Sequence, residues 1–190
     1  MSEQKTIYTI GHSTRSLEEF LALLKRHGIT HLADIRTVPR SRRHPHFTGD
    51  ALATSLPGIV YRHFPGLGGL RKPRADSPNV AWRHEGFRGY ADYMETAEFE
   101  AALDEFLAFG EPSPTGGGGR AARGGGAPRV VMMCAEAVWW RCHRQLVADG
   151  LVARGLEVRH IVSAAAPAAH TLTSFARVSG GRVTYRGLLA

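Results

Sequence analysis

The chain has 190 residues, 43% of them hydrophobic, which is enough for one sizeable buried core. It has no apolar run of the ~18 residues that a membrane-spanning helix needs, and its two cysteines exclude a disulfide-stabilised scaffold. The formal net charge of +7 and the pI of about 10.0 favour anionic partners. Because the polar residues 1–5 lead directly into a predicted strand, we expect a cytoplasmic protein without a signal peptide.

The first part of the chain predicts a strand, a helix and a second strand. Residues 6–10 read as a short buried strand, and residues 11–15 turn out of it. Ser16 and Glu19 have the spacing of a capping box at the amino end of a helix. Apolar residues then recur at helical spacing up to Gly28, a plausible end of the helix, and residues 29–35 supply the next strand. This is the pattern of a βαβ unit.

The middle of the chain begins with a basic loop over residues 36–46, which holds four arginines and no acid. A short helix is predicted over 50–56, a strand over 59–63 and a loop over 66–79. A helical turn over 90–94 precedes a clearer helix that Thr96 caps.

A stretch of glycine, proline, alanine and arginine over residues 110–128 predicts a flexible loop, because it cannot bury enough apolar surface to become ordered. A fourth strand over 129–133, a helix over 143–154 and a fifth strand over 157–162 follow, and Gly180-Gly181 predicts a small hairpin. We therefore expect a single α/β domain over residues 1–190, with a three-layer, mostly parallel sheet and helices on both faces.

Three loops follow the first, second and fourth strands: residues 11–15, 36–43 and 134–144. Ligands bind at the carboxyl ends of strands in α/β sheets. If these three strands are neighbours, the loops form one site.

The sequence resembles the family called domain of unknown function 488. The resemblance runs from Thr6 to about Val162 and is carried by four motifs, which are Thr9-Ile-Gly-His-Ser-Thr-Arg15, Asp34-Ile-Arg-Thr-Val-Pro-Arg-Ser41, Gly86-Phe-Arg-Gly-Tyr90, and Met133-Cys-Ala-Glu136 with Arg141-Cys-His-Arg144. Because no activity is established for that family, the resemblance implies a shared fold and site, and no reaction. A more distant, fold-level likeness is to rhodanese-like domains, in which a strand ending in Asp-x-Arg lies near a catalytic cysteine loop.

Cys134 is the candidate nucleophile, because it ends a strand and is followed by arginines and a helix, which can stabilise a thiolate. Arg141 and Arg36 are candidates to lower its pKa or to hold a substrate, and Glu136 and His12 are candidates to move protons. Each residue also has a structural interpretation. The cysteine could be a small buried hydrophobe, the glutamate could pair with Arg141 or Arg144, and the histidine could hold its loop.

A phosphatase-like phosphate cradle is disfavoured. Such loops place an arginine six positions after the cysteine, where this chain has Trp140, and they use glycine to turn backbone amides inward. Glu136 adds a negative charge where an anion would bind.

The residues predicted to bind a substrate lie in the three loops or in the neighbouring aromatic segments. They are Ser13, Arg36, Arg40, Arg42, Tyr90 and Arg144. Arginines of the basic loop could also contact nucleic-acid phosphates, with nearby aromatic rings stacking on bases. Cys142 and His143 are candidates for a different chemistry, either a resolving thiol for an oxidised Cys134 or a metal site with Cys134 and His12.

These features predict a small enzyme that uses a strand-end cysteine on an anionic or nucleotide-like substrate, and the pattern identifies no particular cofactor. A nucleic-acid or nucleotide binding module is the second interpretation, and a Cys/His metal-binding protein is the third.

Overall fold

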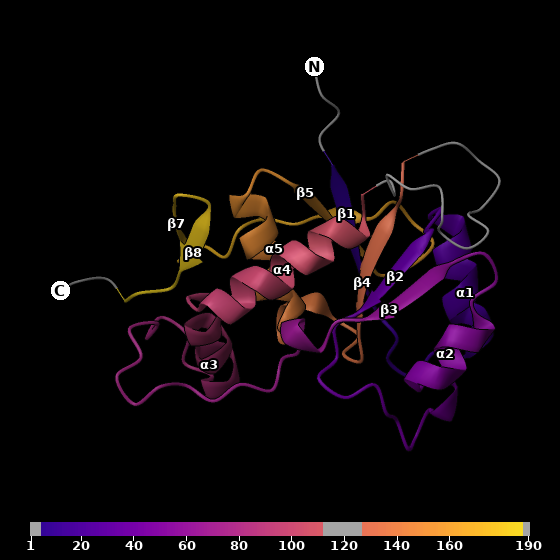
Figure 1. Ribbon diagram of the computed structural model, residues 1–190, viewed down its shortest axis with the longest axis horizontal. Coiled ribbons are helices and arrows are strands. Elements are labelled where there is room, and N and C mark those ends of the chain that lie inside the picture. Colours follow the sequence, from indigo (N-terminus) through magenta and orange to yellow (C-terminus); the bar gives the residue numbers. More distant parts are fainter. Residues whose placement is uncertain (1–4, 112–126, 188–190) are drawn as a thin grey trace.

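The computed structural model describes residues 5–111 and 127–187, and Figure 1 shows how the elements are arranged. In chain order the elements are β1 (Thr6–Gly11), α1 (Leu17–Arg26), β2 (His31–Asp34), η1 (Pro45–Phe47), α2 (Gly49–Ser55), β3 (Val60–His63), η2 (Pro65–Leu67), α3 (Glu85–Met94), α4 (Ala97–Phe109), β4 (Val130–Cys134), η3 (Trp139–Arg141), α5 (Arg144–Ala153), β5 (Glu157–Ile161), β6 (Ala168–Ala169), β7 (Arg177–Ser179) and β8 (Arg182–Thr184). Most of the glycine-rich segment 110–128 lies outside the described residues. Within the described residues, no helix is long and apolar enough to cross a bilayer.

The main sheet has the strand order β3-β2-β4-β1-β5-β6. Its first five strands are parallel, and β6 pairs antiparallel with β5 at one edge. The predicted mostly parallel α/β sheet is thereby confirmed. The strands β2, β4 and β1 are consecutive neighbours, so their carboxyl ends meet at one edge of the sheet, and the three loops that follow them converge as expected.

The sheet is covered on both faces (Figure 1). On one face, residues of β1, β2 and β4 pack with α3, α4 and α5. On the other face, alternate residues of the same strands pack with α1, α2 and η1. All five residues of β4 are buried, as expected for a central parallel strand between two helical layers. Cys134 faces the layer that contains α5.

Local sequence signals explain most of the element boundaries. Ser16 and Glu19 form the predicted capping box at the start of α1, and the Thr96 side chain caps α4. Residues 180 and 181, both glycines with positive φ, turn the β7–β8 hairpin. The helix α3 begins at Glu85 and is longer than the predicted turn over 90–94. Gly89 allows the backbone of Lys72 to pack directly on it.

Gly11 ends β1 at a point of very close backbone packing. It pairs in register with Cys134, and a Cβ at this position would lie 1.9 Å from the carbonyl oxygen of Glu136. Glycine is therefore needed for the Cys134 loop to lie against the end of β1. Two backbone bonds extend this contact, from His12 N to Cys134 O at 2.9 Å and from Ser13 N to Ala135 O at 2.9 Å.

We predict that Gly11→Ala destabilises the fold by about 1–3 kcal/mol, as overpacking of a tight contact typically does, and displaces the loop after β4. Urea unfolding measures the free energy. Gly150→Ala is the matched control, because the nearest atom to its Cβ would be the flexible end of Met94 at 3.4 Å, an ordinary contact distance, and a helical interior favours alanine. Equal unfolding free energies for the two variants would contradict the prediction.

A buried polar chain crosses from the sheet to α5. Thr9 Oγ1 lies 2.7 Å from Nδ1 of His160, whose Nε2 lies 3.0 Å from Nδ1 of His170. Nε2 of His170 lies 2.8 Å from Oδ1 of Asp149, and Tyr185 donates to the other carboxylate oxygen at 2.7 Å. If Thr9 and both neutral imidazoles donate toward the carboxylate, every polar group in the chain is satisfied.

Burial lowers the pKa of His160 from 6.5 to about 3, with the neighbouring His170 and Arg144 as further causes. The folded state therefore prefers the neutral ring. This contribution to stability is complete above pH 6.5 and is lost as the pH falls toward 3. We predict a free energy of unfolding that falls between pH 6.5 and 4, and a shallower fall in His160→Gln.

The measurement is urea unfolding at several pH values. The exposed His84 provides the control, since His84→Gln should reproduce the pH dependence of the unchanged protein. If His160→Gln has the same pH dependence as the unchanged protein, the neutral His160 does not contribute as described.

Candidate functional site

The site lies at the carboxyl edge formed by β2, β4 and β1. It contains a Cys/His/Arg cluster made by Cys134 at the end of β4 and by Cys142, His143 and Arg144 at the start of α5. Both thiols are free and nearly buried, with 9% of Cys134 and 5% of Cys142 exposed. The sequence alone did not show whether the two cysteines face each other, and in the structure they do.

Hydrogen-bond donors converge on the sulfur of Cys142. Arg144 Nε donates to it at 3.4 Å, and His143 Nδ1 lies 3.6 Å from it. The thiol of Cys134 is hydrogen-bonded to the same sulfur. Cys142 also lies at the amino end of the ten-residue helix α5, where the helix dipole favours negative charge. This sulfur therefore has the surroundings of a thiolate.

The two cysteines are shifted in opposite directions. Donation from Cys134, together with His143 and Arg144, lowers the pKa of Cys142 well below its usual value. The hydrogen bond to Cys142 and burial raise the pKa of Cys134. These directions favour Cys142 over Cys134 as the carrier of a thiolate, whereas the sequence had pointed to Cys134. Cys134 acts as the proton donor of the pair, because the buried cation and the helix terminus lie closest to Cys142.

His143 is fixed by its far nitrogen. Nε2 lies 3.1 Å from the carbonyl oxygen of Ile35 and donates to it, so Nδ1 faces Cys142. The donor atoms of Cys134, Cys142 and His143 all lie within 4.8 Å of one another. Such a set, with a histidine oriented by a backbone carbonyl, also suits a thiophilic metal such as Zn²⁺.

A second buried network lies beside this cluster. Arg36 forms a two-point ion pair with Asp34, with Nε to Oδ1 at 2.8 Å and Nη2 to Oδ2 at 2.5 Å. Tyr61 also donates to Asp34, at 2.9 Å, and burial raises the pKa of Tyr61. Because Asp34 neutralises Arg36 at two points, the predicted substrate-binding role of Arg36 is limited to its remaining donors.

His12 completes this network. Its Nδ1 donates to Ser13 O at 3.0 Å, and its Nε2 accepts from Arg36 Nη1 at 3.3 Å. The ring stacks on Phe47 at 4.2 Å between centroids. Burial lowers the pKa of His12 from 6.5 to about 4. Near neutral pH the ring is uncharged and its basic nitrogen is occupied, which favours the loop-holding interpretation over a proton-moving one.

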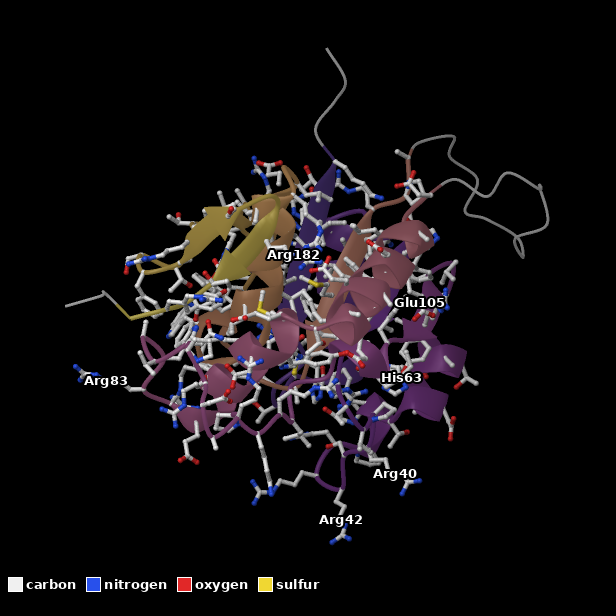
Figure 2. All side chains as sticks on the ribbon, turned by 60° about the vertical axis from the view of Figure 1, so that its left-hand side comes forward. Arg40, Arg42, His63, Arg83, Glu105 and Arg182 are labelled. Carbon is white, nitrogen blue, oxygen red and sulfur yellow. The ribbon has the colours of Figure 1, made fainter. Side chains whose placement is uncertain are left out.

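A hollow of about 410 Å³ opens where the first and third loops meet the basic loop. We call it the edge cleft, and it is lined by His12, Ser13, Thr14, Ser41, Arg42, Arg43, His44, Ala135, Glu136 and Ala137. Ser13, which lines the edge cleft, has a positive φ of 50°, a conformation uncommon for a residue other than glycine. Figure 2 shows Arg42 projecting away from the body of the protein.

The remaining predicted site residues are spread around the cluster. Arg40, also visible in Figure 2, borders a neighbouring hollow of about 690 Å³. The side chain of Arg141 is exposed. Tyr90 is completely buried and donates to Leu67 O at 2.9 Å, with its ring 5.3 Å from that of His143. Tyr90 thus supports His143 from within the core.

Glu136 pairs with neither arginine that the sequence suggested. Its side chain accepts from Ala137 N at 2.9 Å, and Arg144 Nη2 donates to its backbone carbonyl oxygen. Asp34 was not among the predicted site residues, although the Asp34-Ile35-Arg36 motif was a signal for it. Tyr61 was expected only among the aromatic rings that could stack on bases, and its contact with Asp34 was not predicted.

The sequence matches the family model described as "Domain of unknown function DUF488" over residues 16–115 and 119–151. The match includes β2, the basic loop, β4 and most of α5, and so the Cys/His/Arg cluster, whereas β1 and the loop with His12 and Ser13 precede it. No curated protein and no solved structure shows significant similarity to the chain.

Proposed function

The chain belongs to the DUF488 family, and from its site we propose that it is an enzyme whose reactive group is the Cys142 thiolate and whose substrate is an anionic small molecule bound in the edge cleft. The proposal depends on one observation. Arg144 is only 1% exposed, and within the described residues it forms no ion pair with a carboxylate. Its guanidinium instead contacts the sulfur of Cys142 and the carbonyl oxygen of Glu136.

A buried guanidinium without an anion is very unfavourable. A thiolate at Cys142 supplies that anion, and it is also the form of cysteine that attacks electrophilic carbon or sulfur. Arg144 donates a hydrogen bond to this sulfur, and Cys134 and His143 lie beside it. Glu136, which is exposed in the edge cleft, is the group available there to exchange a proton with a substrate.

The charge around the edge cleft supports an anionic substrate. Arg42 and Arg43 are exposed, and within the described part of the chain neither forms an ion pair. His44 lies beside them. The carboxylate of Glu136 turns back to accept a hydrogen bond from Ala137 N, and in this orientation it repels a bound anion least. The phosphate or carboxylate of a substrate would therefore bind on the arginine side of the cleft.

The test of the nucleophile is alkylation with iodoacetamide as a function of pH. Trypsin cuts after Arg141 and so separates the two cysteines for mass spectrometry. We predict that Cys142 reacts at pH values well below its ordinary pKa, and faster than Cys134. Because hydrogen bonds to charged groups contribute about 1.5–3 kcal/mol, Arg144→Met should move the Cys142 profile upward by about one to two pH units.

Arg83→Met removes an exposed arginine elsewhere (Figure 2) and should leave the alkylation profile unchanged. Arg144→Lys keeps the positive charge and tests the idea if Arg144→Met does not fold. The proposal is wrong if Cys142 stays unreactive in the folded protein at every pH. It is also wrong if the untagged protein contains one equivalent of zinc whose removal is needed for alkylation, because Cys134, Cys142 and His143 would then serve as metal ligands.

The test of the anion site is calorimetric titration with adenosine monophosphate and with inorganic phosphate. We predict that Arg42→Ala with Arg43→Ala weakens binding at least about tenfold, because charge-assisted hydrogen bonds are lost. Arg26→Ala with Arg83→Ala makes the same change in net charge at exposed positions outside the cleft. Salt-sensitive binding of an oligonucleotide, without binding of either small anion, would instead support a nucleic-acid binding module.

A further inference from the structure

We propose that Cys134 and Cys142 are a redox pair, in which the Cys142 sulfur reacts with a peroxide and the Cys134 sulfur then closes an intramolecular disulfide. The inference rests on the proposed function, because it takes Cys142 as the thiolate of the site. It adds a second reaction of the same sulfur and a means by which that reaction controls the edge cleft.

The geometry supplies the pairing. The two sulfurs lie within 4.8 Å and share a hydrogen bond. The chain between them is a short loop whose first residues, Ala135 and Glu136, are exposed. A disulfide bond is about 2.05 Å long, so the two side chains need to approach by less than 3 Å. Because both thiols are nearly buried, we expect an oxidant as small as hydrogen peroxide.

The two cysteines have different roles because their surroundings differ. Cys142 receives hydrogen bonds from Arg144 and from the thiol of Cys134, so it is the nucleophile toward the peroxide. Cys134 keeps its proton and has no cation as close, since burial and its hydrogen bond to Cys142 oppose ionisation. The sequence had suggested the opposite order, with Cys142 resolving an oxidised Cys134.

The reaction balances in two steps. The Cys142 thiolate attacks one oxygen of hydrogen peroxide, the O–O bond breaks, and the products are a Cys142 sulfenic acid and hydroxide, which the acid form of the buffer protonates to water. The Cys134 sulfur then attacks the Cys142 sulfur. The S–O bond breaks, the thiol proton leaves with the hydroxyl as water, and a disulfide remains. A dithiol reductant returns both cysteines to the starting state by exchange.

Oxidation also removes the charge that Arg144 faces. A disulfide is neutral, so the buried guanidinium loses its anion and keeps only the carbonyl oxygen of Glu136 as a partner. Because Glu136 lines the edge cleft, a shift of Arg144 moves the wall of the cleft. The redox state of the pair is thereby linked to binding in the cleft.

In the experiment, the full chain is treated with hydrogen peroxide and digested with trypsin, and the peptides are separated without reduction. We expect a disulfide that links residues 130–141 to residues 142–144. In Cys134→Ser, dimedone should trap a sulfenic acid at Cys142. In Cys142→Ser, the adduct at Cys134 should be at least about tenfold slower, because no thiolate is stabilised there.

The result separates the two proposals. Rapid alkylation of Cys142 without disulfide formation overturns the redox pair and leaves the proposed function standing. Failure of both alkylation and oxidation overturns both. A disulfide between two molecules, detected as a dimer on a non-reducing gel, also overturns the intramolecular pair.

Discussion

Burial of Arg144 at the first turn of α5 is the constraint on which the rest of the site depends. A guanidinium cannot lose its proton, so its charge persists and must be balanced within the protein. The nearest group that can carry a negative charge is the sulfur of Cys142, at 3.4 Å from Nε. An anionic Cys142 sulfur favours the protonated form of the neighbouring Cys134, while His143 is oriented by its hydrogen bond to the carbonyl oxygen of Ile35.

The neighbouring network also contains a buried cation, and there a carboxylate balances its charge. Arg36 is also buried, and Asp34 balances it through two hydrogen bonds. His12 then stays neutral, because a protonated ring would face the guanidinium of Arg36. The site thus contains two buried cations with different counterions, one a carboxylate and one a sulfur. A thiolate is a stronger nucleophile than a carboxylate held by two hydrogen bonds, and this difference marks the reactive half of the site.

The sequence predicted what depends on local patterns. The capping box of Ser16, the buried run of β4 and the hairpin at residues 180 and 181 could each be read from neighbouring residues, and each is present. The convergence of three loops required the strand order, which depends on how distant segments pack. Which of the two cysteines carries a thiolate depends on packing in the same way. Both cysteines have arginines nearby in the sequence, and only the fold shows that Arg144 points at Cys142.

The loop between the two cysteines is held from several sides, and this links the sulfur chemistry to the edge cleft. The loop backbone packs directly against Gly11, where a Cβ would clash with the carbonyl oxygen of Glu136. Trp139 stacks on His160 with ring centroids 4.1 Å apart, and His160 belongs to the buried chain that ends at Asp149. Arg144 contacts both Cys142 and the carbonyl oxygen of Glu136. Arg144 therefore joins the sulfur to Glu136 of the edge cleft, within a loop that is otherwise held by close packing.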